Sequence, residues 1–472
     1  MRASVRRDLL RGAFVVVVLG ASASASAMPL REAVERAMTS NPQIGEAIAN
    51  REATEFELDQ ARGGYLPSID LEARAGALLR DSATTRALGR EDDVFAERSV
   101  GVVMRQLLFD GFETRAEVEH QASRVDSASL RVLERSETIA LAVIREYLDL
   151  LRLHRVVAST RENVTYHEQL LGRIEEGTEV GTLSIADQQQ AEERLFAARA
   201  RVVEAIEEVK AAEARFVRLV GHPSGKLSSP PNPRGALPPG LEQAIQLAQQ
   251  NNPTVLAAQA DVDAAHGRLK GAESAFYPTL SLEGRARAGR DLEGVPGADN
   301  ELQAGVVLNW NLFRGGIDRA NRQEQIRRID EATMVLYRIA REVEEAVQLS
   351  WDRRQQQAQR LTYLRDQLGS VRDLVGSYAD QFAIGQRSLV DLLDAQNARV
   401  NAEIAVWTAE AAVQFAEYRI LAATGTLLAT LGVAPPPQSA PYARIQARVP
   451  PAPPPEALDR EPPLSSPLGP LY

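Results

Sequence analysis

The chain has 472 residues, a formal net charge of −10 at pH 7, 5% aromatic residues and no cysteine. The lack of cysteine excludes disulfides, thiolate metal sites and lipidation at cysteine. An acidic chain without a basic cluster argues against nucleic acid and anionic lipid as partners. The low aromatic content favours long helices packed through Ala, Leu and Val over a conventional globular core.

The N-terminus, residues 1–27, is predicted to be a secretory signal peptide. Four arginines precede the apolar run 13–19, and Ala25-Ser26-Ala27 follows it. The apolar run is too short to span a bilayer, which takes about 20 residues. A membrane anchor that stays in place is the alternative. The pattern predicts export across a bacterial inner membrane.

The rest of the chain contains two copies of one unit, 28–220 and 241–432. Leu30–Gly76 matches Leu241–Arg287 at a constant offset, and the matching resumes after a single length change. Each copy is far longer than a solenoid repeat, so each is a domain-sized half. Residues 221–240, rich in proline, are predicted to connect the halves at mid-height. Residues 433–472 are predicted to form a Pro-rich tail that is disordered or draped over the surface.

Both copies are predicted to contain a helix, two strands, a long helix and a returning helix. Pro67 and Pro278 end the first helix of each copy and begin extended segments. In copy one the elements cover about 29–63, 66–79, 98–109, 112–179 and 184–220. In copy two they cover about 240–274, 278–290, 301–313, 316–383 and 388–424.

The predicted strands alternate between small apolar and polar residues. Leu71 and Ala73, for example, alternate with Asp70, Glu72 and Arg74. This period of two suits a transmembrane barrel with a wet lumen. It suits equally a soluble sheet with one solvated face, and the pattern alone leaves both interpretations open.

The long helices are too long for a globular domain. No proline interrupts 112–179 or 316–383, and a helix of that length extends about 100 Å. Copy two carries a coiled-coil seam with spacings of three and four residues, at Ile326, Ile329, Thr333, Leu336, Ala340, Val343, Val347 and Ser350. In each copy the two shorter helices together match the long one. A tall cylinder with a joint halfway along its returning side explains these lengths.

Four motifs in this order closely resemble the TolC family of outer-membrane channel-tunnels. Two are strand exits, Leu108-Phe109-Asp110-Gly111 and Leu312-Phe313-Arg314-Gly315-Gly316. Two are helical tips, Gly181–Asp187 and Gly385–Asp394. The resemblance covers essentially all of 28–432. It implies a mostly α-helical homotrimer in which four strands per chain close a twelve-stranded outer-membrane barrel above a periplasmic helical tunnel.

The polar residues of the second tip are the candidate gate. Asp391 and Asp394 are three residues apart on a predicted helix and therefore share one face. In a trimer they would form two stacked acidic rings that attract cations. The alternative from the residues alone is that an Asp near a helix N-terminus complements the helix dipole. The resemblance favours rings that line a narrow periplasmic entrance.

The resemblance also implies a latch between Arg387 and Asp187 that holds the tip closed. An arginine–carboxylate pair is directional, although exposed pairs contribute only about 0–1 kcal/mol. Phe382 stands where the family commonly has tyrosine, and Ala186 likewise lacks a hydroxyl. The closed state is therefore expected to be less well secured, with Arg387 carrying more of it.

No catalytic pattern is present, so an enzyme, a cofactor and a metal site are not expected. The five histidines show no metal spacing and are predicted to lie on the surface. The favoured function is a passive exit duct in the outer membrane of a Gram-negative bacterium, joined through a periplasmic adaptor to an inner-membrane ABC or RND transporter.

Two uses of such a duct compete: type I protein secretion and small-molecule efflux. Without an N-terminal cysteine the lipid-anchored drug-efflux branch is disfavoured, and the paired tip motifs favour secretion or a dual role. A non-channel periplasmic coiled-coil strut is the alternative from another class. A solute-specific porin fits poorly, because porins need no periplasmic extension of about 100 Å.

Overall fold

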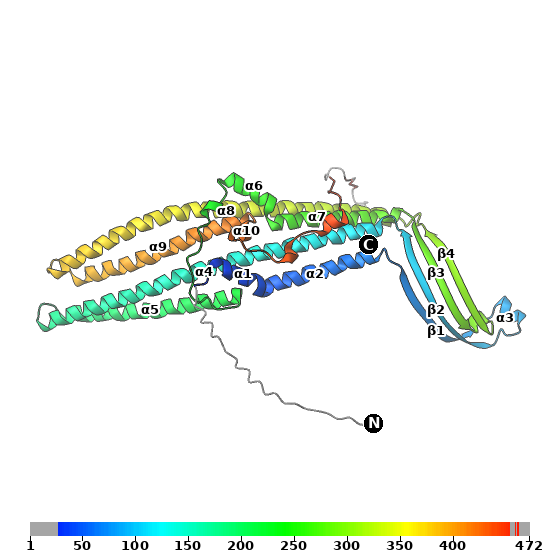
Figure 1. Ribbon diagram of the computed structural model, residues 1–472, viewed down its shortest axis with the longest axis horizontal. Helices are drawn as coiled ribbons and strands as arrows, with labels where there is room; N and C mark the ends of the chain where they lie inside the picture. Colours follow the sequence, from blue (N-terminus) through cyan, green and yellow to red (C-terminus); the bar gives the residue numbers. More distant parts are fainter. Residues whose placement is uncertain (1–26, 454–457, 459, 462–472) are drawn as a thin grey trace, which may run out of the picture.

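The computed structural model describes residues 27–453, 458, 460 and 461. The predicted signal peptide, except Ala27, lies outside these residues, as does much of the end of the tail. The protein is elongated, with a long layer of helices that ends on one side in a curved sheet (Figure 1). No helix in the described ranges combines the length and apolar character that a membrane span requires.

The two copies fold into the same order of elements. Copy one consists of α1 (Leu30–Ser40), α2 (Pro42–Gly63), β1 (Ser68–Leu79), α3 (Ala83–Ala87), β2 (Val94–Phe109), α4 (Glu113–Glu179) and α5 (Ile185–Val220). Copy two consists of α6 (Leu241–Asn251), α7 (Pro253–Glu273), β3 (Thr279–Arg290), β4 (Ala298–Asn309), α8 (Ile317–Ala383) and α9 (Leu389–Ala423). The segment between the copies holds one 3-10 turn, Pro233–Ala236. Two short helices follow α9: α10 (Leu427–Leu431) at the end of copy two, and α11 (Ala443–Ala447) beyond it.

The first helix of each copy is broken in two, where one continuous helix was expected. Asn41 and Asn252 take extended backbone conformations before Pro42 and Pro253, because the residue before proline avoids the helical region. Each asparagine caps the helix that follows. The Asn41 amide also donates to the carbonyl of Leu219, at the end of α5, over 3.0 Å.

Asn252 repeats this arrangement. Its amide donates to the carbonyl of Ala423, at the end of α9, over 2.9 Å. The two Asn-Pro steps therefore form joints. There α2 and α7, which lead to the sheet, meet the ends of α5 and α9, which return from the hairpin turns.

The four strands form one antiparallel sheet in the order β1-β2-β3-β4, with β2 and β3 joining the two copies. Strand β2 begins earlier than expected because Val94 still pairs with Leu79 of β1. Strand β4 ends at Asn309 rather than near 313. Asn309 pairs with Thr279, the first residue of β3, so the residues after it have no neighbour in the ladder.

The strand register separates a polar face from an apolar face. Arg105 lies 2.9 Å from Glu283 across β2 and β3, and Arg287 lies 3.0 Å from Glu301 across β3 and β4. The other face carries Leu71, Val102 and Leu302, all of them exposed in the single chain. The predicted alternation is therefore confirmed.

The helical layer buries its two long helices unequally. Helix α4 contributes buried side chains along most of its length, and the main apolar core forms around its middle with α1, the end of α5 and α10. Helix α8 has the same length but few buried residues within this chain: Ile326, Ile329, Val347, Ser350, Leu361 and Leu368. One face of α8 therefore remains without a partner.

Of the two predicted arrangements of residues 433–472, disordered or draped over the surface, the part that the structure describes adopts the second. Backbone N–H groups of Tyr442, Ala443 and Arg444 donate to the buried carboxylate of Asp126 on α4. Further on, Arg460 binds Asp330 of α8 through several hydrogen bonds. The segment therefore docks on both copies, despite its proline-rich composition.

The prediction of surface histidines is wrong for His120, His167 and His266, which are buried. The ring of His120 hydrogen-bonds the Ala264 carbonyl through Nδ1 over 2.8 Å and accepts from Arg268 through Nε2 over 3.0 Å. Burial, and then the charge of Arg268, lower the pKa of His120. His120 thus joins α4 to α7, a role that its spacing did not indicate.

Candidate functional site at the helical tip

Both helical hairpins end in a tight turn centred on a glycine. Gly181 between α4 and α5 and Gly385 between α8 and α9 have φ values of 78° and 73°, a left-handed conformation that favours glycine. The chain reverses within a few residues in each case, and both turns lie at the end of the molecule opposite the sheet (Figure 1).

Asp187 and Asp391 occupy equivalent positions one turn into the returning helices. Ser184 caps α5, and its hydroxyl donates to Asp187 over 2.7 Å. Ser388 caps α9, and its hydroxyl donates to Asp391 over 2.8 Å. Each carboxylate thus stabilises its own helix N-terminus, as the alternative interpretation of Asp391 expected.

Arg387 folds back over the end of α8. Its guanidinium lies 4.2 Å from the centre of the Tyr378 ring, and Nε donates to Gln381 over 3.1 Å. Its Nη1 lies 3.7 Å from the Asp391 carboxylate. Within one chain Arg387 and Asp187 therefore each have other partners, and the latch between them stays a prediction.

Asp394 connects the two hairpins. Its carboxylate lies 3.2 Å from Nη2 of Arg194 on α5, and both side chains are at least partly exposed. Asp391 and Asp394 lie one helical turn apart on α9, as expected, but the arginine next to each carboxylate differs. If Asp391 and Asp394 form acidic rings, the positive charges of Arg387 and Arg194 must lie beside those rings.

Phe382 packs into an apolar cluster that also joins the hairpins. It contacts a group formed by Leu170, Ile174, Ala191, Leu389, Leu392 and Leu393. Beside the cluster lies a cavity of about 470 Å³, bounded by Tyr166, Leu183 and Phe382 among others. Phe382 is thus a packing residue of the tip, and Leu183 packs beside it.

Above the tip, a polar layer lies between the hairpins, and the sequence did not reveal it. Gln396 donates to Asn163 over 2.9 Å, and the Ser159 hydroxyl donates to Glu403 over 3.0 Å. Arg372 on α8 also binds Glu403, over 3.0 Å. The only available signal was the placement of polar residues on otherwise apolar helix stripes.

The two strand exits differ although their motifs match. Phe109 packs edge-on against Phe112 with ring centres 5.3 Å apart, while Phe313 is 84% exposed. At Gly111 a side chain would lie 2.7 Å from the Ser274 carbonyl, whereas Gly315 has open space around it. The first exit is therefore packed within the chain and the second is not.

The sequence also matches known proteins. The profile of the outer membrane efflux protein family covers residues 33–222 and 244–426, most of the chain. The chain belongs to this family. It is a family of outer-membrane channels rather than of enzymes.

Two known proteins show how similar the chain is to its relatives. The outer membrane efflux protein BepC of Brucella suis is 26% identical over 85% of this chain and 86% of its own length. The alkaline protease secretion protein AprF of Pseudomonas aeruginosa is 24% identical over 90% and 88%.

A solved structure confirms the fold expected for this efflux family member. A membrane protein from Pseudomonas aeruginosa superposes with a TM-score of 0.74 at 20% identity, over 84% of this chain and 90% of that one. The predicted fold class, mostly helical with a four-stranded antiparallel sheet, is confirmed.

Proposed function

We propose that this protein is the outer-membrane exit duct of a tripartite export system in a Gram-negative bacterium. One observation supports this most directly. Each chain joins two helical hairpins, built on helices of 67 residues, to a four-stranded sheet with one polar and one apolar face. Such helices extend about 100 Å, so a single protein can reach from the outer membrane deep into the periplasm.

The sheet supports a homotrimer. Strands β1 and β4 are the sheet edges in one chain, and unpaired strand edges are not tolerated in lipid. Three chains would pair these edges and close twelve strands into a barrel, with the polar face towards a wet lumen and the apolar face towards lipid. The unburied face of α8 supports the same assembly, with Met334, Tyr337, Leu349 and Tyr363 among its exposed residues.

The tip would be the gate of this duct. In a trimer Asp391 and Asp394 would form acidic rings that favour cations at the constriction. Arg387, Asp187 and Phe382 would hold the closed state. Arg387 is bound to Tyr378, Gln381 and Asp391 within the chain, so its removal should loosen the turn itself.

The cargo we propose is protein, by type I secretion, or small molecules, by efflux. The similarity to a protein named for alkaline protease secretion supports the first, and the similarity to an efflux protein supports the second. In either case a periplasmic adaptor and an inner-membrane ABC or RND transporter would supply the connection and the energy. The duct itself would need no cofactor.

Conductance of the purified mature protein in planar bilayers tests the duct. We expect a small, cation-selective conductance that rises in Arg387→Ala. In the double variant Asp391→Asn/Asp394→Asn the cation preference should be lost. Asn keeps a side-chain oxygen at the helix cap. Glu168→Gln is the control, because it neutralises an exposed carboxylate on α4 outside the tip motifs and should leave the cation preference unchanged. A folded protein without conductance would contradict the proposal and favour a strut, whereas a wide ungated pore would contradict only the gate.

A further inference from the structure

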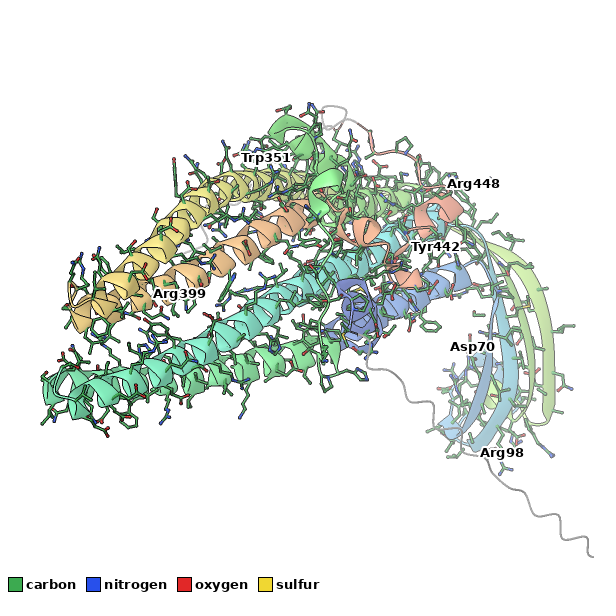
Figure 2. All side chains as sticks on the ribbon, turned by 60° about the vertical axis from the view of Figure 1, so that its left-hand side comes forward. Asp70, Arg98, Trp351, Arg399, Tyr442 and Arg448 are labelled. Atoms are coloured by element: carbon green, nitrogen blue, oxygen red, sulfur yellow. The ribbon has the colours of Figure 1, made fainter. Side chains whose placement is uncertain are left out.

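Two arginines lie directly opposite each other on the apolar face of the sheet. Arg98 of β2 pairs in register with Arg290 of β3, and both side chains are exposed. Opposite residues of an antiparallel pair project from the same face, and like charges placed in this way destabilise the sheet. Figure 2 shows Arg98 near the end of the sheet that is remote from the helices.

Neither arginine has an acidic partner among the residues that the structure describes. On the polar face, by contrast, Arg105 and Arg287 both form ion pairs with strand neighbours. The row that holds Arg98 and Arg290 is completed by Ala75 on β1 and Ala298 on β4. These small neighbours leave both guanidinium groups uncovered on the outer surface.

Measured along the strand from the helix side of the sheet, the row of Arg98 and Arg290 lies at the height expected for the opposite edge of a membrane. Leu280, which pairs with Leu308, lies on the apolar face near the helices, and this end of the face is called its lower edge. Arg290 follows ten residues later on the same strand. At about 3.3 Å per residue and a tilt of about 40°, this distance spans about 25 Å, the height of the apolar band of an outer-membrane barrel.

The two edges of this band differ in composition. The lower edge carries exposed Tyr277, Trp310 and Phe313, as expected for an aromatic girdle. Near the far edge, the segments 77–100 and 286–300 contain one aromatic residue, Phe95, and its side chain is buried. Arginines therefore occupy the far interface in place of exposed aromatic residues.

We propose that Arg98 and Arg290 together bind a phosphate group of lipid A, the phosphorylated glycolipid of the outer leaflet. Arginine binds phosphate through paired hydrogen bonds, and one phosphate between two guanidinium groups would turn their repulsion into attraction. The proposal rests on the barrel of the proposed function and is independent of its cargo. The acidic composition argued against anionic lipid, but the strand register creates a local basic pair from residues far apart in the sequence.

Thermal stability with added lipid tests the site. The purified protein in detergent is titrated with phosphorylated lipid A, dephosphorylated lipid A or inorganic phosphate, and the midpoint of heat denaturation is measured. We expect phosphorylated lipid A alone to raise the midpoint, and native mass spectrometry to show it bound. Arg98→Glu places a carboxylate opposite Arg290, so the protein should fold with unchanged or greater stability while its affinity for lipid A falls about tenfold or more.

Arg285→Ala is the control, because Arg285 lies on β3, the strand that carries Arg290, but on the polar face of the sheet. This variant should bind lipid A like the wild type. The proposal is overturned if Arg98→Glu binds lipid A as tightly as the wild type, or if the dephosphorylated lipid protects equally. It is also overturned if inorganic phosphate protects as well as the lipid, since the site would then be a simple anion site. A wild-type protein that conducts normally in bilayers but does not bind lipid A would leave the proposed duct intact and reject this inference alone.

Discussion

Gln396 on α9 donates a hydrogen bond from Nε2 to Oδ1 of Asn163 on α4 over 2.9 Å, and both side chains are buried between the two helical hairpins. The Ser159–Glu403 hydrogen bond joins the same two helices. This polar layer lies between the apolar cluster of the tip and the core at mid-height. If the hairpins separate on opening, these buried groups must lose their partners.

Removing one partner of this pair should favour the open state. Asn163→Ala leaves Gln396 buried without its acceptor, a cost of about 1–3 kcal/mol to the closed packing. We expect a higher open probability in planar bilayers. The double variant Asn163→Leu/Gln396→Leu should return towards the wild type, because replacing both polar partners by apolar groups is nearly neutral. Arg199→Ala, which removes an exposed pair with Glu168, is the control; an equal effect there would reject a specific role for the polar layer.

Asp126 should hold the C-terminal segment on the helices. Its buried carboxylate accepts three backbone N–H bonds and lies 2.9 Å from Nε of Arg444. Asp126→Ala leaves these donors unpaired, and we expect a loss of about 3–5 kcal/mol in the docking of this segment. Limited trypsin digestion followed by intact mass should then show rapid cleavage at Arg444 and Arg448. Arg328→Ala, which removes an exposed pair with Glu331, should leave the segment resistant. Equal resistance of Asp126→Ala would contradict this prediction.

Glu137 should make stability fall as pH rises. Burial raises the pKa of this carboxyl from 4.5 to about 7, while the Leu428 N–H bonds its Oε1 over 3.3 Å. Between these two pH values the unfolded chain binds fewer protons than the folded protein, so stability declines as pH rises through about 4.5 to 7. The full loss is on the order of 3 kcal/mol.

The neutral variant Glu137→Gln tests this pH dependence. Its heat-denaturation midpoint should exceed that of the wild type at pH 8 and approach it at pH 5. The buried histidines titrate in both proteins, so comparing the two proteins at each pH cancels their contribution. Parallel pH profiles for the two proteins would show that Glu137 is not responsible.

The equivalent glycines of the two strand exits should differ in their tolerance of a side chain. Gly111 and Gly315 have φ values of 67° and 65°, so alanine at either position costs about 1–2 kcal/mol of backbone strain. At Gly111 the new methyl group would also lie 2.7 Å from the Ser274 carbonyl oxygen. We expect Gly111→Ala to lower the denaturation midpoint clearly more than Gly315→Ala. Equal midpoints would show that this contact relaxes without cost.

The sequence by itself determined the repeat, the order of the elements and the alternation of the strands. Each of these follows from short-range rules: the residue before Pro67 avoids the helical region, alternate residues face opposite sides, and glycines permit the turns at the tip. The break before Pro42 follows the same rules, so it could have been predicted from the Asn-Pro step. These properties could be predicted because the backbone preference of a residue depends on a few neighbours.

Only the tertiary structure decided which side chains meet. Arg98 with Arg290, Asn163 with Gln396 and Asp126 with Arg444 are all distant in the sequence. Their contacts depend on strand register and on the rotation of one long helix against another. A shift of one residue would turn each strand side chain to the opposite face. Local preferences do not encode that register, because it is fixed by the packing of the whole assembled chain.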